Sequence, residues 1–159
     1  MSIRIIRTGK DPVLRQVAKP VAAVNRAVEK LLDDLAETMY HAEGIGLAAN
    51  QVGVLKRVVV IDVGTGLIEL VNPEIVEKSP EVDTDAEACL SLPGLRGDVP
   101  RPKQVTIKAQ NRQGEEFTLE ADGLLARCAQ HELDHLDGVL FIDYLRPEQI
   151  IRESEGSRR

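Results

Sequence analysis

Two histidines and a glutamate in the last third of the chain form the sequence H-E-x-x-H, at His131, Glu132 and His135. Residues four apart lie on one face of a helix, so both imidazoles can bind one metal ion from the same side. Glu132 lies beside the first histidine, where its carboxylate can reach a water molecule on the metal and accept a proton. The chain has only three histidines. We therefore favour a metal site over an amphipathic helix in which this spacing arises by chance.

The segment around this motif is predicted to be a helix. Asp122 stands at a possible helix start, and Gly138 stands where a glycine commonly ends a helix. Apolar residues and the histidines recur at helical intervals between them, and no proline interrupts residues 123–138. The helix would present both imidazoles on one stripe.

Two histidines leave such a site short of a ligand, and the chain contains two cysteines. Cys128 lies seven residues before His135, so their Cα atoms would be about 10.5 Å apart along a helix axis. Both side chains would be strained in reaching one ion, and we expect Cys128 to be a small apolar wall residue. Cys89, in the segment 87–94, is the better candidate, although a buried free thiol is the alternative. A Cys89–Cys128 disulfide is a further competing interpretation.

The composition excludes several classes of function. A chain of 159 residues with a net charge of −6 and a pI near 5.1 argues against a nucleic-acid-binding face. Aromatic residues make up 3% and tryptophan is absent, so platforms for base stacking are not expected. No apolar run approaches the roughly 18 residues of a membrane span. Residues 1–7 do not resemble a signal peptide, and two cysteines then favour reduced thiols in a cytoplasm.

The remaining pattern predicts an α+β fold. Asn25 can cap an amphipathic helix that ends near residue 41, and a shorter helical piece follows Pro12. Asn111–Gly114 is a hairpin turn, and Asn72-Pro73 is expected to end the second strand. Strand patterns occur at residues 57–62, 67–71, 99–109, 116–120 and 139–145. We predict a single compact domain, residues 1–152, with largely antiparallel β-sheets packed around the C-terminal helix that carries H-E-x-x-H, followed by a frayed tail, residues 153–159.

Three stretches, taken together, resemble the peptide deformylase family. The first family motif, G-x-G-x-A-A-x-Q, is matched by Gly44–Gln51, and the third, Q-H-E-x-D-H, by Gln130–His135. The second, E-G-C-x-S, appears as Glu87–Ser91 with Ala88 in place of glycine. The order and spacing of three motifs are far more specific than H-E-x-x-H alone, and the resemblance covers nearly the whole chain.

This resemblance implies a hydrolase that removes the N-formyl group from the initiator methionine of nascent polypeptides and releases formate. It implies that Cys89, His131 and His135 bind one divalent metal ion per chain, with water in the open fourth position. Fe(II) is the ion expected natively, and zinc, nickel or cobalt can occupy the site. The ligand types alone indicate zinc or iron.

The family analogy also assigns the catalytic roles. Glu132 acts as general base and then returns its proton to the departing amine. The side-chain amide of Gln51 and the backbone N–H of Leu90 stabilise the negative charge that develops on the formyl oxygen.

Substrate binding is expected to involve five residues. Ile45, Leu124 and Cys128 are candidates for the apolar slot that accepts the methionine side chain. The backbone of Ile45–Gly46 and of Ala88 would pair with the extended peptide as an added strand. If Ala88 had a positive φ, its methyl group would cost strain.

Two arginines are expected to lie close to the helix that carries H-E-x-x-H. Arg101 and Asp134 are expected to form an ion pair that steadies the ligand helix. Arg127 is expected to extend past the pocket with its head group in water and to narrow the entrance.

Two other functions compete with deformylation. A general metallopeptidase shares H-E-x-x-H, but a cysteine ligand and a small chain count against it. A binding module that has lost catalysis would not need Glu132 or Gln51. The expected partners are N-formylmethionyl nascent peptides, with association with the ribosome, and neither nucleic-acid binding nor membrane binding is expected.

Overall fold

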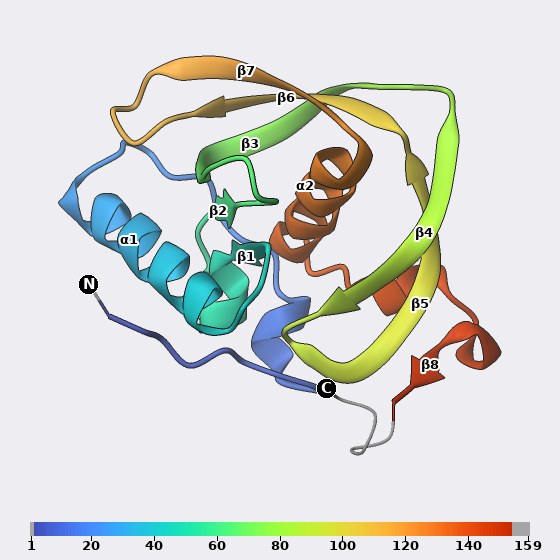
Figure 1. Ribbon diagram of the computed structural model, residues 1–159. Coiled ribbons are helices and arrows are strands. Elements are labelled where there is room, and N and C mark those ends of the chain that lie inside the picture. The colour runs from blue at the N-terminus through green and yellow to red at the C-terminus, as the bar shows by residue number, and fades with distance from the viewer. Residues whose placement is uncertain (1, 154–159) are drawn as a thin grey trace.

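The computed structural model describes residues 2–153, which form two antiparallel sheets and two α-helices (Figure 1). The helices are α1 (Arg26–His41) and α2 (Gly123–Leu136). The five-stranded sheet has the order β1 (Gly46–Ala48), β2 (Val58–Ile61), β3 (Ile68–Lys78), β6 (Gln104–Gln110) and β7 (Glu116–Asp122). The three-stranded sheet has the order β4 (Val82–Cys89), β5 (Leu92–Pro102) and β8 (Ile151–Arg152). The α+β class and the antiparallel pairing are as predicted.

Both faces of the five-stranded sheet are covered at β2, which explains why all four residues of this strand are buried. Val58 and Val60 belong to a cluster with the apolar stripe of α1, whereas Val59 and Ile61 belong to a cluster with α2. Successive side chains of a strand point to opposite faces, so β2 lies between the two helices. The sheet thus places α2 at the centre of the molecule (Figure 1).

The ends of α1 and α2 follow local rules. The side chain of Asn25 accepts a hydrogen bond of 3.0 Å from the N–H of Val28 and caps α1, as predicted. Asp122 stands at the start of α2 but makes no capping bond with its side chain. At the other end the N–H of Gly138, at φ +74°, donates to His135 O, and that of Val139 donates to Asp134 O. This Schellman arrangement needs the left-handed residue that glycine supplies.

The strand predictions were wrong at three places. The predicted strand 99–109 is two strands in different sheets, because the chain passes from β5 to β6 at Lys103. Asn72 and Pro73 do not end β3, because Asn72 adopts φ +52° and the register shifts there. Residues 141–144 of the predicted strand 139–145 form a 3-10 helix, η3 (Phe141–Tyr144), in which Asp143 accepts a hydrogen bond from Leu140 N–H.

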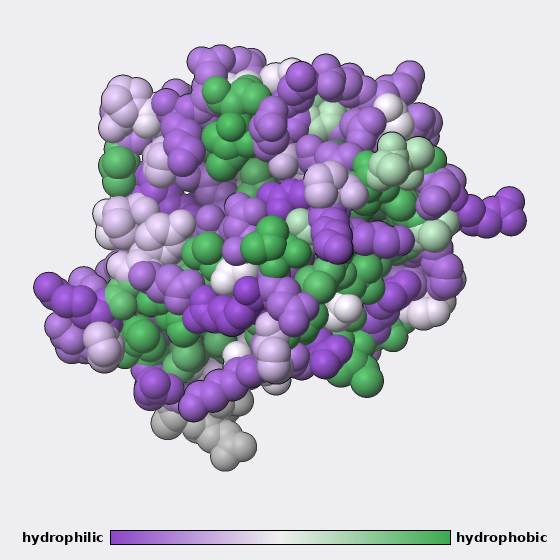
Figure 2. Space-filling model, turned by 180° about the vertical axis from the view of Figure 1, so that it is seen from behind, coloured by the Kyte–Doolittle hydropathy of each residue, from purple (hydrophilic) through white to green (hydrophobic). Residues whose placement is uncertain are grey.

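Smaller elements complete the fold around α2. A second 3-10 helix, η1 (Pro12–Arg15), begins at Pro12 as expected. Of the predicted tail, Glu153 donates its N–H to Gly94 O, and residues 154–159 lie outside the described residues. None of the helices in residues 2–153 is both long enough and apolar enough to cross a membrane. The rear face shows apolar patches interspersed with hydrophilic residues (Figure 2).

Candidate metal centre and active site

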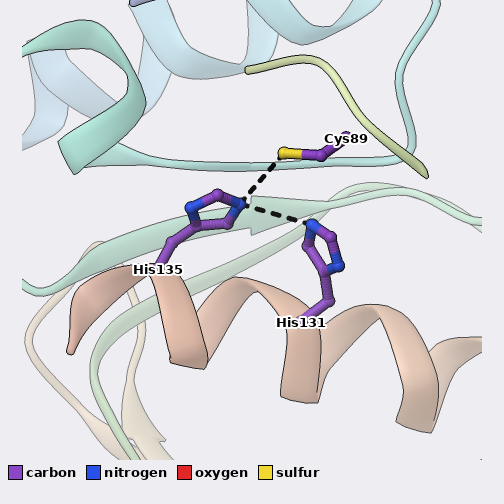
Figure 3. A group of neighbouring side chains, drawn as sticks. All are labelled: Cys89, His131 and His135. Atoms are coloured by element: carbon purple, nitrogen blue, oxygen red, sulfur yellow. Dashed lines mark hydrogen bonds between the residues drawn. The ribbon is translucent and has the colours of Figure 1, made fainter. Parts of the chain in front are cut away.

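The side chain of Cys89 meets those of His131 and His135, which are distant from it in the sequence (Figure 3). Cys89 is the last residue of β4, and His131 and His135 lie one turn apart on α2. The Nε2 atom of His135 lies 3.3 Å from Cys89 Sγ and 3.3 Å from His131 Nε2. All three potential ligand atoms lie within 4.8 Å of one another. The three residues predicted to bind a metal are therefore brought together.

This donor set fits a divalent metal ion. Nitrogen and sulfur ligands about 2.0–2.3 Å from a tetrahedral ion lie roughly 3.3–3.7 Å from one another, close to the separations seen here. His131 Nδ1 lies 2.9 Å from Glu87 Oε1, which leaves Nε2 directed at the site. Cys89 Sγ accepts a hydrogen bond from Ser91 N–H, which helps to fix the position of the sulfur. An imidazole pair and a thiolate suit zinc or iron.

The two imidazoles are too close for both to carry a proton. The pKa of His131 is raised to about 10, because bonds with Cys89 and Glu87 outweigh the effect of burial. Burial and the neighbouring charge of His131 lower the pKa of His135 well below its ordinary value. Without an ion the His131 ring therefore holds a proton and His135 is neutral; a bound cation would take the place of that proton between the two Nε2 atoms and the sulfur.

Glu132 is buried next to these ligands and is free of hydrogen bonds at one oxygen. Among the described residues, its Oε1 atom has no hydrogen-bond partner. Burial raises the pKa of Glu132 to about 7, and the charge of His131 opposes this rise. A carboxylate with an uncommitted oxygen and a pKa near neutrality is suited to accept and return a proton.

The amide of Gln51 is fixed in place from both ends. Its Oε1 atom accepts a hydrogen bond of 3.0 Å from Ala48 N–H, and its Nε2 atom donates to Ser91 Oγ at 3.0 Å. The same Nε2 lies 3.8 Å from Cys89 Sγ. The backbone N–H groups of Arg7 and Gly9 in turn donate to the carbonyls of Gln51 and Ser91. The amide donor therefore points into the site without freedom to rotate away.

A cavity of about 370 Å³ opens beside the three ligands. All the residues predicted to bind substrate line this cavity: Ile45, Gly46, Ala88, Leu124 and Cys128. Ile45 and Leu124 are 43% and 54% exposed, so they lie where the cavity meets solvent. Leu90 and Gln51 line it as well. Cys128 is a buried free thiol that is not grouped with the metal ligands, so the disulfide is excluded.

Comparison with known proteins places this arrangement in a family. A family model described as polypeptide deformylase matches residues 3–150. The chain belongs to the polypeptide deformylase family. The peptide deformylase of Caldicellulosiruptor bescii is 57% identical over 99% of this chain and 98% of its own length. That of Acetivibrio thermocellus is 53% identical over 100% and 95%.

Solved deformylase structures agree with this assignment. The crystal structure of the Thermotoga maritima enzyme has a TM-score of 0.88 at 46% identity, covering 91% of this chain and 99% of that one. The Ehrlichia chaffeensis enzyme, solved in complex with actinonin, has a TM-score of 0.91 at 39% identity, covering 93% and 91%. The fold class, the family and the enzymatic activity predicted from the sequence are confirmed. The chain is a metal-dependent hydrolase that removes the N-formyl group of nascent polypeptides.

Ala88, the departure from the deformylase motif, carries no backbone strain. Among the described residues, only Glu43 and Asn72 are non-glycine residues with positive φ. Ala88 pairs with Arg96 in the β4–β5 ladder, and its side chain is exposed. An alanine therefore fits this position of a deformylase in ordinary strand geometry.

The prediction for Arg127 was wrong. Its side chain is buried, and its guanidinium donates to Glu87 Oε2 at 2.6 Å and to the backbone carbonyls of Asp83 and Val99, each at 2.8 Å. Helical periodicity placed Arg127 one turn before His131, but no pattern in the chain indicated the acceptors that a neighbouring strand provides. Unpaired, the head group would have to reach water, whereas these three acceptors allow its burial.

Sequence reasoning missed the role of Glu87, which joins Arg127 to the ligands. The carboxylate of Glu87 receives bonds from Arg101 Nε at 2.5 Å and Nη2 at 2.9 Å, as well as from His131 Nδ1. These bonds hold the pKa of Glu87 at about 2 although burial opposes this. Its place two residues before Cys89 was the available signal. The expected Arg101–Asp134 pair is present, at 2.9 Å.

Proposed function

We propose that Cys89, His131 and His135 hold one divalent ion, and that Glu132 and Gln51 perform deformylation beside it. The observation that supports this most is the convergence of three ligand atoms with an unpartnered carboxylate oxygen at one cavity. The chemistry that a divalent ion supplies when bound is Lewis-acid catalysis, which polarises a carbonyl group and makes water more acidic. We expect Fe(II) natively, with zinc, nickel or cobalt as substitutes.

Glu132 carries the proton in this proposal. It accepts a proton from the water that attacks the formyl carbon, and it delivers that proton to the amine as the carbon–nitrogen bond breaks. The products are formate and a peptide with a free amino terminus. The buried position of Glu132 supports this role, because few other groups compete for its free oxygen.

Gln51 and Leu90 stabilise the charge that develops on the formyl oxygen. The Nε2 group of Gln51 is a neutral donor aimed at the ligand side of the cavity, and its orientation is fixed before substrate binds. The backbone N–H of Leu90 follows Cys89 directly and is proposed as the second donor. Donors that need no reorganisation are the most effective in stabilising a transition state.

The peptide is proposed to bind along the cavity wall. The methionine side chain enters between Leu124, Cys128 and Ile45, and the backbone of Gly46 and Ala88 pairs with the chain that follows it. The catalytic domain is residues 1–152. The substrate is made at the ribosome, so we propose that the enzyme meets its nascent peptides there, in the cytoplasm and without contacting nucleic acid directly.

Replacing Glu132 by glutamine tests the proposal. Formate release from a formyl-Met tripeptide should fall by at least about 100-fold, since general acid–base catalysis contributes roughly 10²–10⁴-fold. Metal per chain, measured on the same anaerobic sample, should stay near the wild-type value because Glu132 is not a ligand.

The alternatives predict different outcomes in the same assay. A metallopeptidase would cleave an internal bond of an unformylated peptide, and a binding module would hold metal and peptide without releasing formate. A Glu132→Gln enzyme that turns over as fast as the wild type would contradict the role of the base. An acetylated tripeptide is the negative control.

A further inference from the structure

The strand that carries Cys89 lies at the edge of its sheet. β4 pairs with β5 on one side, and within residues 2–153 it has no partner strand on the other. The histidine ligands lie on α2, which packs mainly against the other sheet. The distance from Cys89 to the two histidines therefore depends on side chains that connect β4 with α2.

Arg127 makes most of the hydrogen bonds that connect the two elements. Its Nη2 donates to Asp83 O at 2.8 Å, and its Nη1 donates to Glu87 Oε2 at 2.6 Å and lies 3.4 Å from Asp85 O. All three acceptors belong to β4, at alternate residues of the strand. A further bond to Val99 O, at 2.8 Å, includes β5. One guanidinium thus holds β4 along most of its length.

The guanidinium of Arg127 is also connected, through Glu87, to the proposed metal ligand His131. Glu87 accepts from Arg127 with Oε2 and faces His131 Nδ1 with Oε1. Arg127 and His131 are four residues apart on α2 and lie on the same face of the helix. The orientation of the His131 ring and the position of β4 are therefore fixed by one connected group of buried atoms.

We propose that Arg127 is a positioning residue that sets the geometry of the metal ligands by tying β4 to α2. The inference rests on the proposed ligand set of Cys89, His131 and His135. Only a planar fork with several donors reaches these acceptors together, so lysine is not an equivalent substitute. Arg127 helps to retain the ion and to keep the metal ligands in position, and it takes no part in proton transfer.

The test compares Arg127→Met and Arg127→Lys with the wild type, each loaded with Co(II). The absorption spectrum reports thiolate coordination, and transfer of Co(II) to a chelator gives the rate of release. We expect release from Arg127→Met to be faster by about tenfold or more, as for other residues that orient metal ligands. The spectrum should change, kcat should fall more than KM rises, and Arg127→Lys should be intermediate.

Arg112→Met is the matched control. Arg112 also bonds two acidic side chains, Asp33 at 2.7 Å and Glu69, but it does not line the cavity. The Arg112→Met protein should keep the wild-type Co(II) spectrum and the wild-type rate of Co(II) release. If Arg112→Met released Co(II) as fast as Arg127→Met, general destabilisation of the fold would explain the effect and the proposal would be overturned.

The remaining outcomes separate the two proposals. Wild-type release and spectrum in a folded Arg127→Met would overturn the role of Arg127 and leave the ligand set intact. If Arg127→Met does not fold, a wild-type release rate in Arg127→Lys overturns the role equally. A wild-type protein without a thiolate–Co(II) absorption band would contradict the ligand set itself.

Discussion

Gln51 shows how the backbone prepares a side chain for chemistry. Its carbonyl oxygen is held by Ala48 N–H, so the amide cannot flip, and the N–H side must face Ser91 and Cys89. A glutamine that faced water would sample several rotamers and would have to be ordered in each turnover. For the proposed role of Gln51, these bonds therefore matter as much as its own donor group.

Replacing Gln51 by leucine should leave the cavity filled but remove the donor. We expect kcat to fall by about 10²–10³-fold with little change in KM, the loss typical of one oxyanion donor. Steady-state formate release measures both constants. Asn50→Leu is the control, because Asn50 is equally buried but its amide donates to Gln16 O, away from the cavity. A Gln51→Leu enzyme with unchanged kcat would show that the donor is not used.

Motif residues were predictable from the sequence because types and spacing suffice to identify them. His131, His135 and Cys89 are residue types that commonly bind metal ions, and the structure brings them together. Arg127 could not be predicted in the same way. Whether a long charged side chain is buried depends on the carbonyls of Asp83 and Val99, which a different part of the chain supplies.

The approach of β1 to α2 requires a residue without a side chain. A Cβ atom on Gly46 would lie 2.7 Å from Glu132 Oε2 and 2.8 Å from Cys128 Sγ. The side chains of Glu132 and Cys128 would have to shift to make room for such an atom. Gly46 thus matters for space, since its φ is not positive.

Gly46→Ala should therefore displace Glu132 without unfolding the protein. We expect kcat for deformylation to drop by at least about tenfold, since a small displacement of a catalytic group can cost 10²-fold. Metal content should stay close to that of the wild type. Thermal unfolding followed by circular dichroism checks that the fold is kept. Full activity would mean that the carboxylate has room to shift without consequence.

At the scale of elements, α1 and α2 could be predicted, whereas several strand limits could not. Each helix carries its own periodic stripe and end signals, such as Asn25 and Gly138. Residues 99–109 have a continuous β pattern, and only the packing of two sheets reveals that the chain changes sheet at Lys103. The bulge at Asn72 likewise depends on its bonds with Val21 and Gln110.

A buried carboxylate, that of Asp34, makes several of the bonds that hold the N-terminal segment against α1. Asp34 accepts bonds from Ser2 N–H at 2.8 Å and Arg4 Nε at 2.9 Å, and Lys30 lies 3.2 Å away. The segment runs along α1 (Figure 1) and continues to Arg7, whose N–H bonds Gln51 O. Burial raises the pKa of Asp34, but the bonds from Arg4 and Ser2 outweigh this, so its pKa is lowered.

The free energy of unfolding of the whole molecule should depend on the charge of Asp34, and this dependence should appear at acid pH. A lowered folded pKa contributes stability above the unfolded value of 3.8, and this contribution is lost as pH falls through the folded pKa. Asp34→Asn should cost about 1–3 kcal/mol near neutral pH. The difference from the wild type should shrink below a pH of about 4.

Urea unfolding at a series of pH values measures this difference. Asp98→Asn, at an exposed aspartate of β5, is the control and should leave the curve unchanged. A constant difference between Asp34→Asn and the wild type from pH 7 to pH 3 would contradict the role of the Asp34 charge.

The proposed metal ligands come from two separate elements, β4 and α2. We therefore expect the fold to form before the metal ion binds. In the unfolded chain His131 lies 42 positions after Cys89. An ion that bound both residues there would have to offset the entropic cost of closing this loop without help from the packing of the core. Short zinc modules, with ligands a few residues apart, fold around their metal. Here we expect the packing of α2 against the sheet to precede binding of the ion. Heating that breaks this core should release the ion and unfold the chain in a single transition.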